Sequence, residues 1–175
     1  MKLHAMLATA VTAVMLSGCM TALLPKASEP TSGPRARIRL IGGAGDLMIR
    51  PEKQPGDKRG DMVAHGLLWP GNRVRIGMPD DEEPTRLADE HYVIADQDVD
   101  AFFSFRMDTP GNKYEPGTIQ KCGPIDAKFH VDDGGDYEVS SRITNKECFI
   151  VVRRLLAVNG RIVTKMPVML KPRFP

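Results

Sequence analysis

Residues with the chemistry of a catalytic site are few in this chain, and their spacing matches no catalytic pattern. His65, His91 and His130 form neither a His-Glu-x-x-His motif nor a pair four residues apart, so the sequence carries no zinc-hydrolase signature. It also lacks the Gly-x-Ser-x-Gly turn that presents the nucleophile of many serine hydrolases. We therefore predict a non-enzymatic protein without catalytic, cofactor-binding or metal-ligating residues.

A run of alternating acids is the one candidate for a cation site. Asp96, Asp98 and Asp100 match the first half of an EF-hand calcium loop. Such a loop requires Gly at its sixth position and Glu at its twelfth, and this chain has Ala101 and Met107 there. These acids are therefore expected to end one strand and begin the next, with a weak, irregular cation site as the open alternative.

The first 18 residues have the features of an export signal. Lys2 supplies a positive start, and Ala5–Leu16 is an uncharged apolar stretch of 12 residues. A transmembrane helix needs about 20 apolar residues, so this stretch is too short to span a bilayer. We predict that residues 1–18 are a signal peptide.

The residues that follow the apolar stretch point to a lipid anchor. Leu16-Ser17-Gly18-Cys19 resembles the lipobox of bacterial lipoproteins. The resemblance implies cleavage before Cys19, diacylation of its sulfur and acylation of its new amino group, for example with palmitate. Several acyl chains on one residue would hold the protein firmly on a membrane surface. Met20, where an Asp would favour the inner membrane, implies the outer membrane.

Once Cys19 is acylated, Cys122 and Cys148 remain as a pair. Exported proteins readily form disulfides, and two cysteines 26 positions apart lack the close ligand spacing of a zinc site. We predict a Cys122–Cys148 disulfide. Two short alternating segments, Ala127–Val131 and Asp136–Val139, flank a turn containing two glycines, so we expect a β-hairpin that brings the cysteines together.

The rest of the mature chain divides into a tether and one domain. Residues 19–34 comprise the acylated cysteine and a stretch with Pro, Ser and Thr but no apolar period, which predicts a flexible tether. Arg35–Leu40 has an apolar residue at every second position, so it predicts a half-buried strand with its three arginines facing water. The domain is expected to span residues 35–175.

Further segments of this domain also have strand character. Cys148–Val152 is continuously apolar and predicts a central strand covered on both faces. Asn159-Gly160 between two β-rich runs favours a type I′ hairpin. Phe103, Phe105 and Met107 are expected in the core.

The number and spacing of these segments define the fold class. Short apolar runs separated by Gly and Pro, almost without helical period, predict an all-β domain. The expected architecture is an immunoglobulin-like β-sandwich of about 7–9 short antiparallel strands, with a small β-barrel as the alternative. His130 alternates with Phe129 and Val131 and is therefore expected to face solvent.

A second resemblance concerns the segment between the cysteines. The Cys-Gly-Pro start at Cys122, the strand Gly134-Gly135-Asp136-Tyr137-Glu138-Val139 and the closing Cys148 are similar to a pattern in small uncharacterised envelope lipoproteins of Gram-negative bacteria. This similarity implies a periplasm-facing sandwich and transfers no active residues. Tyr137 is expected either to pack in the core or to hydrogen-bond a nearby loop carbonyl as in a tyrosine corner.

Three function classes follow from these observations. The leading one is a lipid-anchored, non-enzymatic interaction protein that binds another envelope protein through a sheet edge or loop face. A net charge of +2 lacks the basic bias of a nucleic-acid binder. A small-molecule or glycan-binding module is the second class, with Trp69, Tyr92 and Tyr114 as its candidate aromatics. An envelope hydrolase is the third, because catalytic residues can converge from distant positions.

Overall fold

The computed structural model describes residues 29–41, 45–51, 64–66, 74–80, 88–144 and 147–171, without the side chains of residues 51 and 64–66. The predicted signal peptide, Cys19, Trp69 and most of the predicted tether lie outside these residues. No helix in the described part of the chain is long and apolar enough to cross a membrane.

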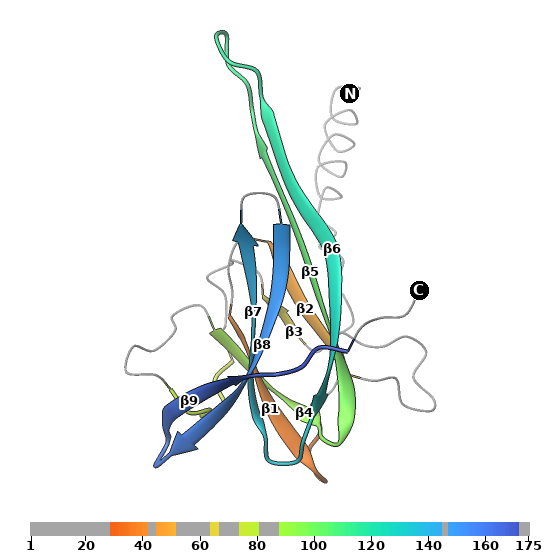
Figure 1. The fold of residues 1–175 in the computed structure, drawn as a ribbon, viewed down its shortest axis with the longest axis vertical. Coiled ribbons are helices and arrows are strands. Elements are labelled where there is room, and N and C mark those ends of the chain that lie inside the picture. The colour runs from red at the N-terminus through yellow and green to blue at the C-terminus, as the bar shows by residue number, and fades with distance from the viewer. Residues whose placement is uncertain are drawn as a thin grey trace, which may run out of the picture.

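The described residues form two β-sheets (Figure 1). The strands are β1 (Arg35–Ile41), β2 (Asp46–Pro51), β3 (Ala64–Gly66), β4 (Ala88–Ile94), β5 (Gln97–Thr109), β6 (Thr118–Val131), β7 (Asp136–Thr144), β8 (Glu147–Val158) and β9 (Arg161–Pro167). One sheet has the order β4-β1-β7-β8-β9 and the other the order β3-β2-β5-β6. The predicted all-β sandwich is confirmed, and the barrel alternative is wrong because the sheets do not close on each other.

Two details of the predicted sandwich need correction. β1 pairs with β4 in antiparallel fashion but with β7 in parallel, so the sheet is mixed. The strands are also not uniformly short, since β5 has 13 residues and β6 has 14. Neither feature has a local sequence signal, because both depend on which distant strand lies alongside.

The inner faces of the two sheets form one hydrophobic core. Ile38 and Leu40 of β1 and Val139 of β7 are completely buried, as are Val99 of β5 and Phe129 of β6 in the facing sheet. Side chains in a strand alternate between faces, so the period-two pattern of β1 places every second residue in this core. Burying each such side chain stabilises the fold by about 1.5–3 kcal/mol.

The predicted hairpin between the cysteines is wrong. β6 lies in the four-stranded sheet and β7 in the five-stranded sheet, so the turn at residues 132–135 carries the chain from one sheet to the other. The backbone N–H of Gly134 donates to the carbonyl of Arg35, and that of Gly135 donates to Asp132. The glycine-rich turn is real, but it makes a corner of the sandwich.

Cys122 of β6 and Cys148 of β8 nevertheless lie at disulfide distance, with their Cα atoms 6.0 Å apart. The pair joins the two sheets across the core and is packed against it. The cysteines therefore approach because the sheets face each other, and not because a hairpin brings its own ends together.

The predicted hairpin at Asn159-Gly160 is confirmed. β8 and β9 are antiparallel neighbours, and the two turn residues have φ values of 52° and 78°. The prediction that β8 is covered on both faces is wrong, since Ile150 and Val152 are buried in the core whereas Phe149 is exposed. β8 is a central strand of a sheet whose outer face is open at this position.

The β5–β6 hairpin extends far beyond the sandwich (Figure 1). β2 accompanies β5 only as far as Ser104, and beyond that point β5 pairs only with β6. Phe103 is buried and Phe105 is partly buried, but Met107 is 44% exposed, which corrects its predicted place in the core. We call residues 106–121 the arm.

Candidate functional site

The outer face of the five-stranded sheet carries a group of charged residues, the charged face. Alternate residues of five neighbouring strands contribute to it: Arg37 and Arg39 of β1, Glu90 of β4, Asp136 and Glu138 of β7, Arg153 of β8 and Lys165 of β9. In register, Arg39 lies between Glu90 and Glu138. Arg39 is fully buried, so the prediction that this arginine faces water is wrong.

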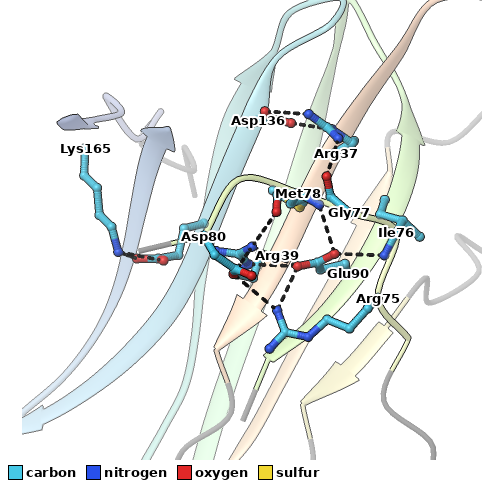
Figure 2. Close-up of polar contacts among 11 residues, drawn as sticks. Arg37, Arg39, Arg75, Ile76, Gly77, Met78, Asp80, Glu90, Asp136 and Lys165 are labelled. Atoms are coloured by element: carbon cyan, nitrogen blue, oxygen red, sulfur yellow. Dashed lines mark hydrogen bonds and ion pairs between the residues drawn. The ribbon is translucent and has the colours of Figure 1, made fainter. Parts of the chain in front are cut away.

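Arg39 is buried because residues 74–80, which we call the covering segment, cross this face (Figure 2). Near β4 the backbone N–H of Glu90 donates to the carbonyl of Val74 at 2.9 Å. Near β9 the N–H of Ile162 donates to the carbonyl of Asp80 at 3.2 Å. The covering segment thus bridges the two edge strands of the five-stranded sheet.

The carboxylate of Glu90 is the centre of the contacts under the covering segment (Figure 2). Its Oε1 accepts a hydrogen bond from Arg75 at 2.9 Å and two from Arg39 at 2.9 and 3.1 Å. Its Oε2 accepts backbone hydrogen bonds from Ile76 at 2.8 Å and Met78 at 3.2 Å. Burial alone would raise the pKa of Glu90, but hydrogen bonds from Arg75, Arg39 and the two amides hold that pKa below its usual value.

The rest of the charged face is also paired. Glu138 is nearly buried, and its carboxylate contacts Lys165 at 3.0 Å and Arg153 at 3.5 Å. Arg37 binds both carboxylate oxygens of Asp136, at 2.6 and 2.8 Å. Each of these carboxylates is engaged by protein cations, so the arrangement favours a structural role.

His91 on the opposite face of β4 is a second buried polar group. Its Nδ1 lies 2.8 Å from Glu29 Oε1, and its Nε2 lies 2.9 Å from Asp89 Oδ2. The second contact is an ion pair that lies off the ideal hydrogen-bond direction. Burial would lower the pKa of His91, but Asp89 and Glu29 outweigh burial and raise that pKa above 6.5.

Two of the three acids considered for a cation site, Asp98 and Asp100, contact protein cations. Asp98 contacts Lys171 at 2.6 Å and His130 at 3.1 Å, and the hydrogen bond from Lys171 does most to hold the pKa of Asp98 below its usual value. Lys128 lies 3.9 Å from Asp100. Within the described residues, no group of three or more His, Cys, Asp or Glu side chains is placed to hold a metal ion. His130 is exposed, as predicted.

Of the candidate aromatics for a ligand site, the two that the structure describes, Tyr92 and Tyr114, do not come together. Tyr92 of β4 lies under the guanidinium of Arg35, 4.7 Å from ring centroid to Cζ. Tyr114 stands in the loop at the end of the arm and is 86% exposed. Tyr137 is buried in the core, and its hydroxyl accepts from the backbone N–H of Asp132 and donates to the carboxylate of that same residue.

The arm is the element that sequence reasoning missed. Pro and Gly at residues 110–117 mark a turn, but they do not show where the core beneath it ends. The side chain of Asn112 accepts hydrogen bonds from the backbone N–H groups of Tyr114 and Glu115, at 2.8 and 3.0 Å. Lys113 lies 5.8 Å from the centre of the Tyr114 ring. The tip is therefore an ordered turn that presents an aromatic ring.

The base of the arm is held by several independent features. The β5–β6 register shifts between Phe103 and Phe105, which marks a bulge that re-aims the two strands. Gly123 has a φ of +83°, and a Cβ there would lie 2.6 Å from the carbonyl oxygen of Phe103. The cysteine pair joins this base to β8. The direction of the arm is thus set by the sandwich below it.

No family model, curated protein or solved structure matches this chain. Its function therefore has to be inferred from its own residues and their geometry.

Proposed function

We propose that the protein is a lipid-anchored, non-enzymatic interaction protein of the cell envelope that binds another envelope protein through the β5–β6 arm. The observation that carries this proposal is the arm itself, a ribbon that leaves the sandwich and buries nothing in its own domain. A two-stranded ribbon has little stability of its own in water. The arm extends about 20–25 Å into solvent from a base that the sandwich holds in place, as expected of an element that binds a partner.

The arm offers two kinds of contact to a partner protein. Along the arm, the outer edges of β6 and of β5 beyond Ser104 have no neighbouring strand among the described residues, so their backbone groups can accept an added strand. The side chains differ between faces, with Met107 and Gln120 on one and Arg106 and Lys121 on the other. A mixed surface of this kind suits a protein surface better than the apolar interior of a bilayer.

Tyr114 is the expected energetic centre of the contact. It is the most exposed aromatic side chain of the described residues, and the Asn112 turn holds its backbone in place. Tyrosine is enriched among the residues that dominate protein interfaces, because its ring buries a large area at a small entropic cost. An ordered turn at the tip would suit a partner with a pocket that accepts the Tyr114 ring.

A photo-crosslinking amino acid in place of Tyr114 is expected to capture one envelope protein in intact cells, and Tyr114→Ala is expected to weaken that complex at least about tenfold. The matched control places the same crosslinker at His130, which is exposed on β6 at the end of that strand away from the arm. Equal capture from both positions, or capture of glycan alone, would contradict binding through the arm. Mass spectrometry identifies the captured species.

The anchor is tested separately at Cys19. Replacing this cysteine by alanine is expected to release the protein into the soluble periplasmic fraction and to abolish incorporation of labelled fatty acid, because the acyl chains supply the membrane affinity. Fractionation of outer membranes shows where the wild-type chain is held. A variant that stays with the membranes and still incorporates label would show that the lipobox interpretation is wrong.

A further inference from the structure

The surroundings of His91 demand an unusual charge state. The side chain is 1% exposed, and each of its two ring nitrogens lies within 2.9 Å of a carboxylate oxygen. Carboxylates only accept hydrogen bonds, so Nδ1 must carry a proton to bond Glu29. A second proton, on Nε2, makes the ring a cation that attracts both carboxylates, although Nε2 lies off the hydrogen-bond direction to Asp89. A neutral ring would turn an unprotonated nitrogen toward one carboxylate, and two lone pairs would then face each other in a buried site.

The charged groups that contact His91 come from two segments. Glu29 belongs to the chain before β1, and Asp89 belongs to β4 itself. β1 places the apolar residue Ile38 opposite His91, and Glu90 points to the other side of the sheet. Within the described side chains, the proton on His91 is thus held by these two carboxylates.

The two carboxylates differ in how firmly they are held. Asp89 sits on a strand, and its Oδ1 accepts a hydrogen bond from the backbone N–H of Val74 at 2.8 Å. Glu29 lies at the start of a segment with few attachments. Pro30 accepts a long bond of 3.5 Å from Arg35, and the next backbone bond, from Ala95 to Pro34, comes four residues later. A neutral ring no longer attracts two carboxylates, and Glu29, which lies on the less firmly attached segment, is the one that can move away.

We propose that His91 is a proton-dependent clasp that fixes the chain at Glu29 to the sandwich and releases residues 29–33 when it loses a proton. The bond between Ala95 and Pro34 stays in place, so the release is confined to these five residues. At about 3.4 Å per extended residue, the five released residues would span at most about 17 Å. Any effect of this release on how far the arm reaches from the membrane rests on the proposed lipid anchor.

The direction of the pH effect follows from the surroundings of the ring. Because the folded pKa of His91 is raised, the stabilisation from its proton is complete below 6.5 and is lost as pH rises through the folded value. The clasp is therefore closed on the acid side and opens on the alkaline side.

Nuclear magnetic resonance on the unacylated Cys19→Ala chain tests the clasp directly. Backbone amides of Thr31, Ser32 and Gly33 are expected to be ordered near pH 5 and mobile near pH 9.5, with order parameters falling from about 0.85 to below about 0.6. In Glu29→Ala these amides should be mobile at both pH values, and the ring of His91 should titrate at a lower pH.

Two histidine variants complete the test. His91→Gln should remove the pH dependence, whereas His130→Gln should keep it, because His130 is an exposed histidine beside a different carboxylate. Amides that behave alike at both pH values in the wild-type sequence would overturn the clasp, and so would a pH dependence that survives in His91→Gln. None of these readouts requires acylation, so failure of the anchor would show only in the fatty-acid labelling.

Discussion

Replacing Glu90 by alanine is expected to lower the free energy of unfolding by about 3–5 kcal/mol, because it leaves the charge of Arg39 buried without its main partner. The side chain of Arg39 is 1% exposed and donates two hydrogen bonds to this one carboxylate. The change also removes the acceptor for two backbone amides of the covering segment. Urea unfolding followed by circular dichroism measures the effect.

Asp80→Ala is the matched control. Asp80 binds the same guanidinium at 2.9 Å, but its side chain is 48% exposed, so water can replace it. Its loss should cost less than about 1 kcal/mol. The double variant Arg39→Met, Glu90→Leu should be more stable than Glu90→Ala, because no charge is then left buried at this position. Equal losses for Glu90→Ala and Asp80→Ala would contradict the central role of Glu90.

The lowered pKa of Glu90 also predicts how the free energy of unfolding depends on pH. Its pKa is lowered from 4.5 in the folded chain, so its contribution is complete above 4.5 and is lost as pH falls through the folded value. Unfolding curves of wild type and Glu90→Gln recorded across this range should converge at the acid end. The opposite trend, a gap that widens in acid, would show that other groups control the pH dependence.

The second large effect is expected at the cysteine pair. Replacing Cys122 and Cys148 by alanine should cost about 2–5 kcal/mol, since a cross-link over this sequence separation is worth roughly 3.5 kcal/mol on the chain-entropy estimate. For a domain of this size the Tm should fall by about 10 °C or more. The base of the arm should also loosen, because Cys122 lies directly below it.

Reduction of the wild-type chain supplies an internal control. A reductant should lower the Tm of the wild type and leave that of the double alanine variant unchanged, which separates loss of the bond from loss of packing at the cysteines. Mass spectrometry of a non-reduced digest should find the two peptides joined. Free thiols at both positions in protein purified from the periplasm would refute the disulfide.

Features that depend on neighbouring residues could be predicted from the sequence. The hairpin at Asn159-Gly160 needs two adjacent residues that tolerate positive φ, and both requirements lie in the turn itself. The alternation in β1 likewise predicted a strand and its buried side. In each case the deciding chemistry lies within a few residues.

The charged face could not be predicted because its partners are distant in sequence. The alternation correctly places Arg39 on the opposite side of the strand from Ile38, but the outer face of a sheet is normally exposed to solvent. Burial of Arg39 requires a segment 39 residues away to cover it and a carboxylate 51 residues away to pair with it. The alternating pattern of β1 predicts neither the covering segment nor the distant carboxylate.

The cysteine pair shows how a correct expectation can have a wrong cause. The count of cysteines was enough to suggest partners, and the two residues lie at disulfide distance. The glycine-rich turn between them predicts a hairpin only in part, because turn residues signal only a change of direction. Whether a turn returns the chain to its own sheet or delivers it to the facing sheet depends on the packing of both sheets.

The parallel pairing of β1 and β7 has a consequence for the order in which the chain can assemble. β1 begins at Arg35, and its partner β7 begins at Asp136, so the bond between Arg37 and Asp136 spans 99 residues. While the chain is being synthesised, β4 can complete one edge of β1, but the other edge has no partner until most of the domain has emerged. Contacts of such long range close slowly. During that interval β1 is an open edge that other chains can join, so assembly of this protein should depend on keeping nascent chains apart.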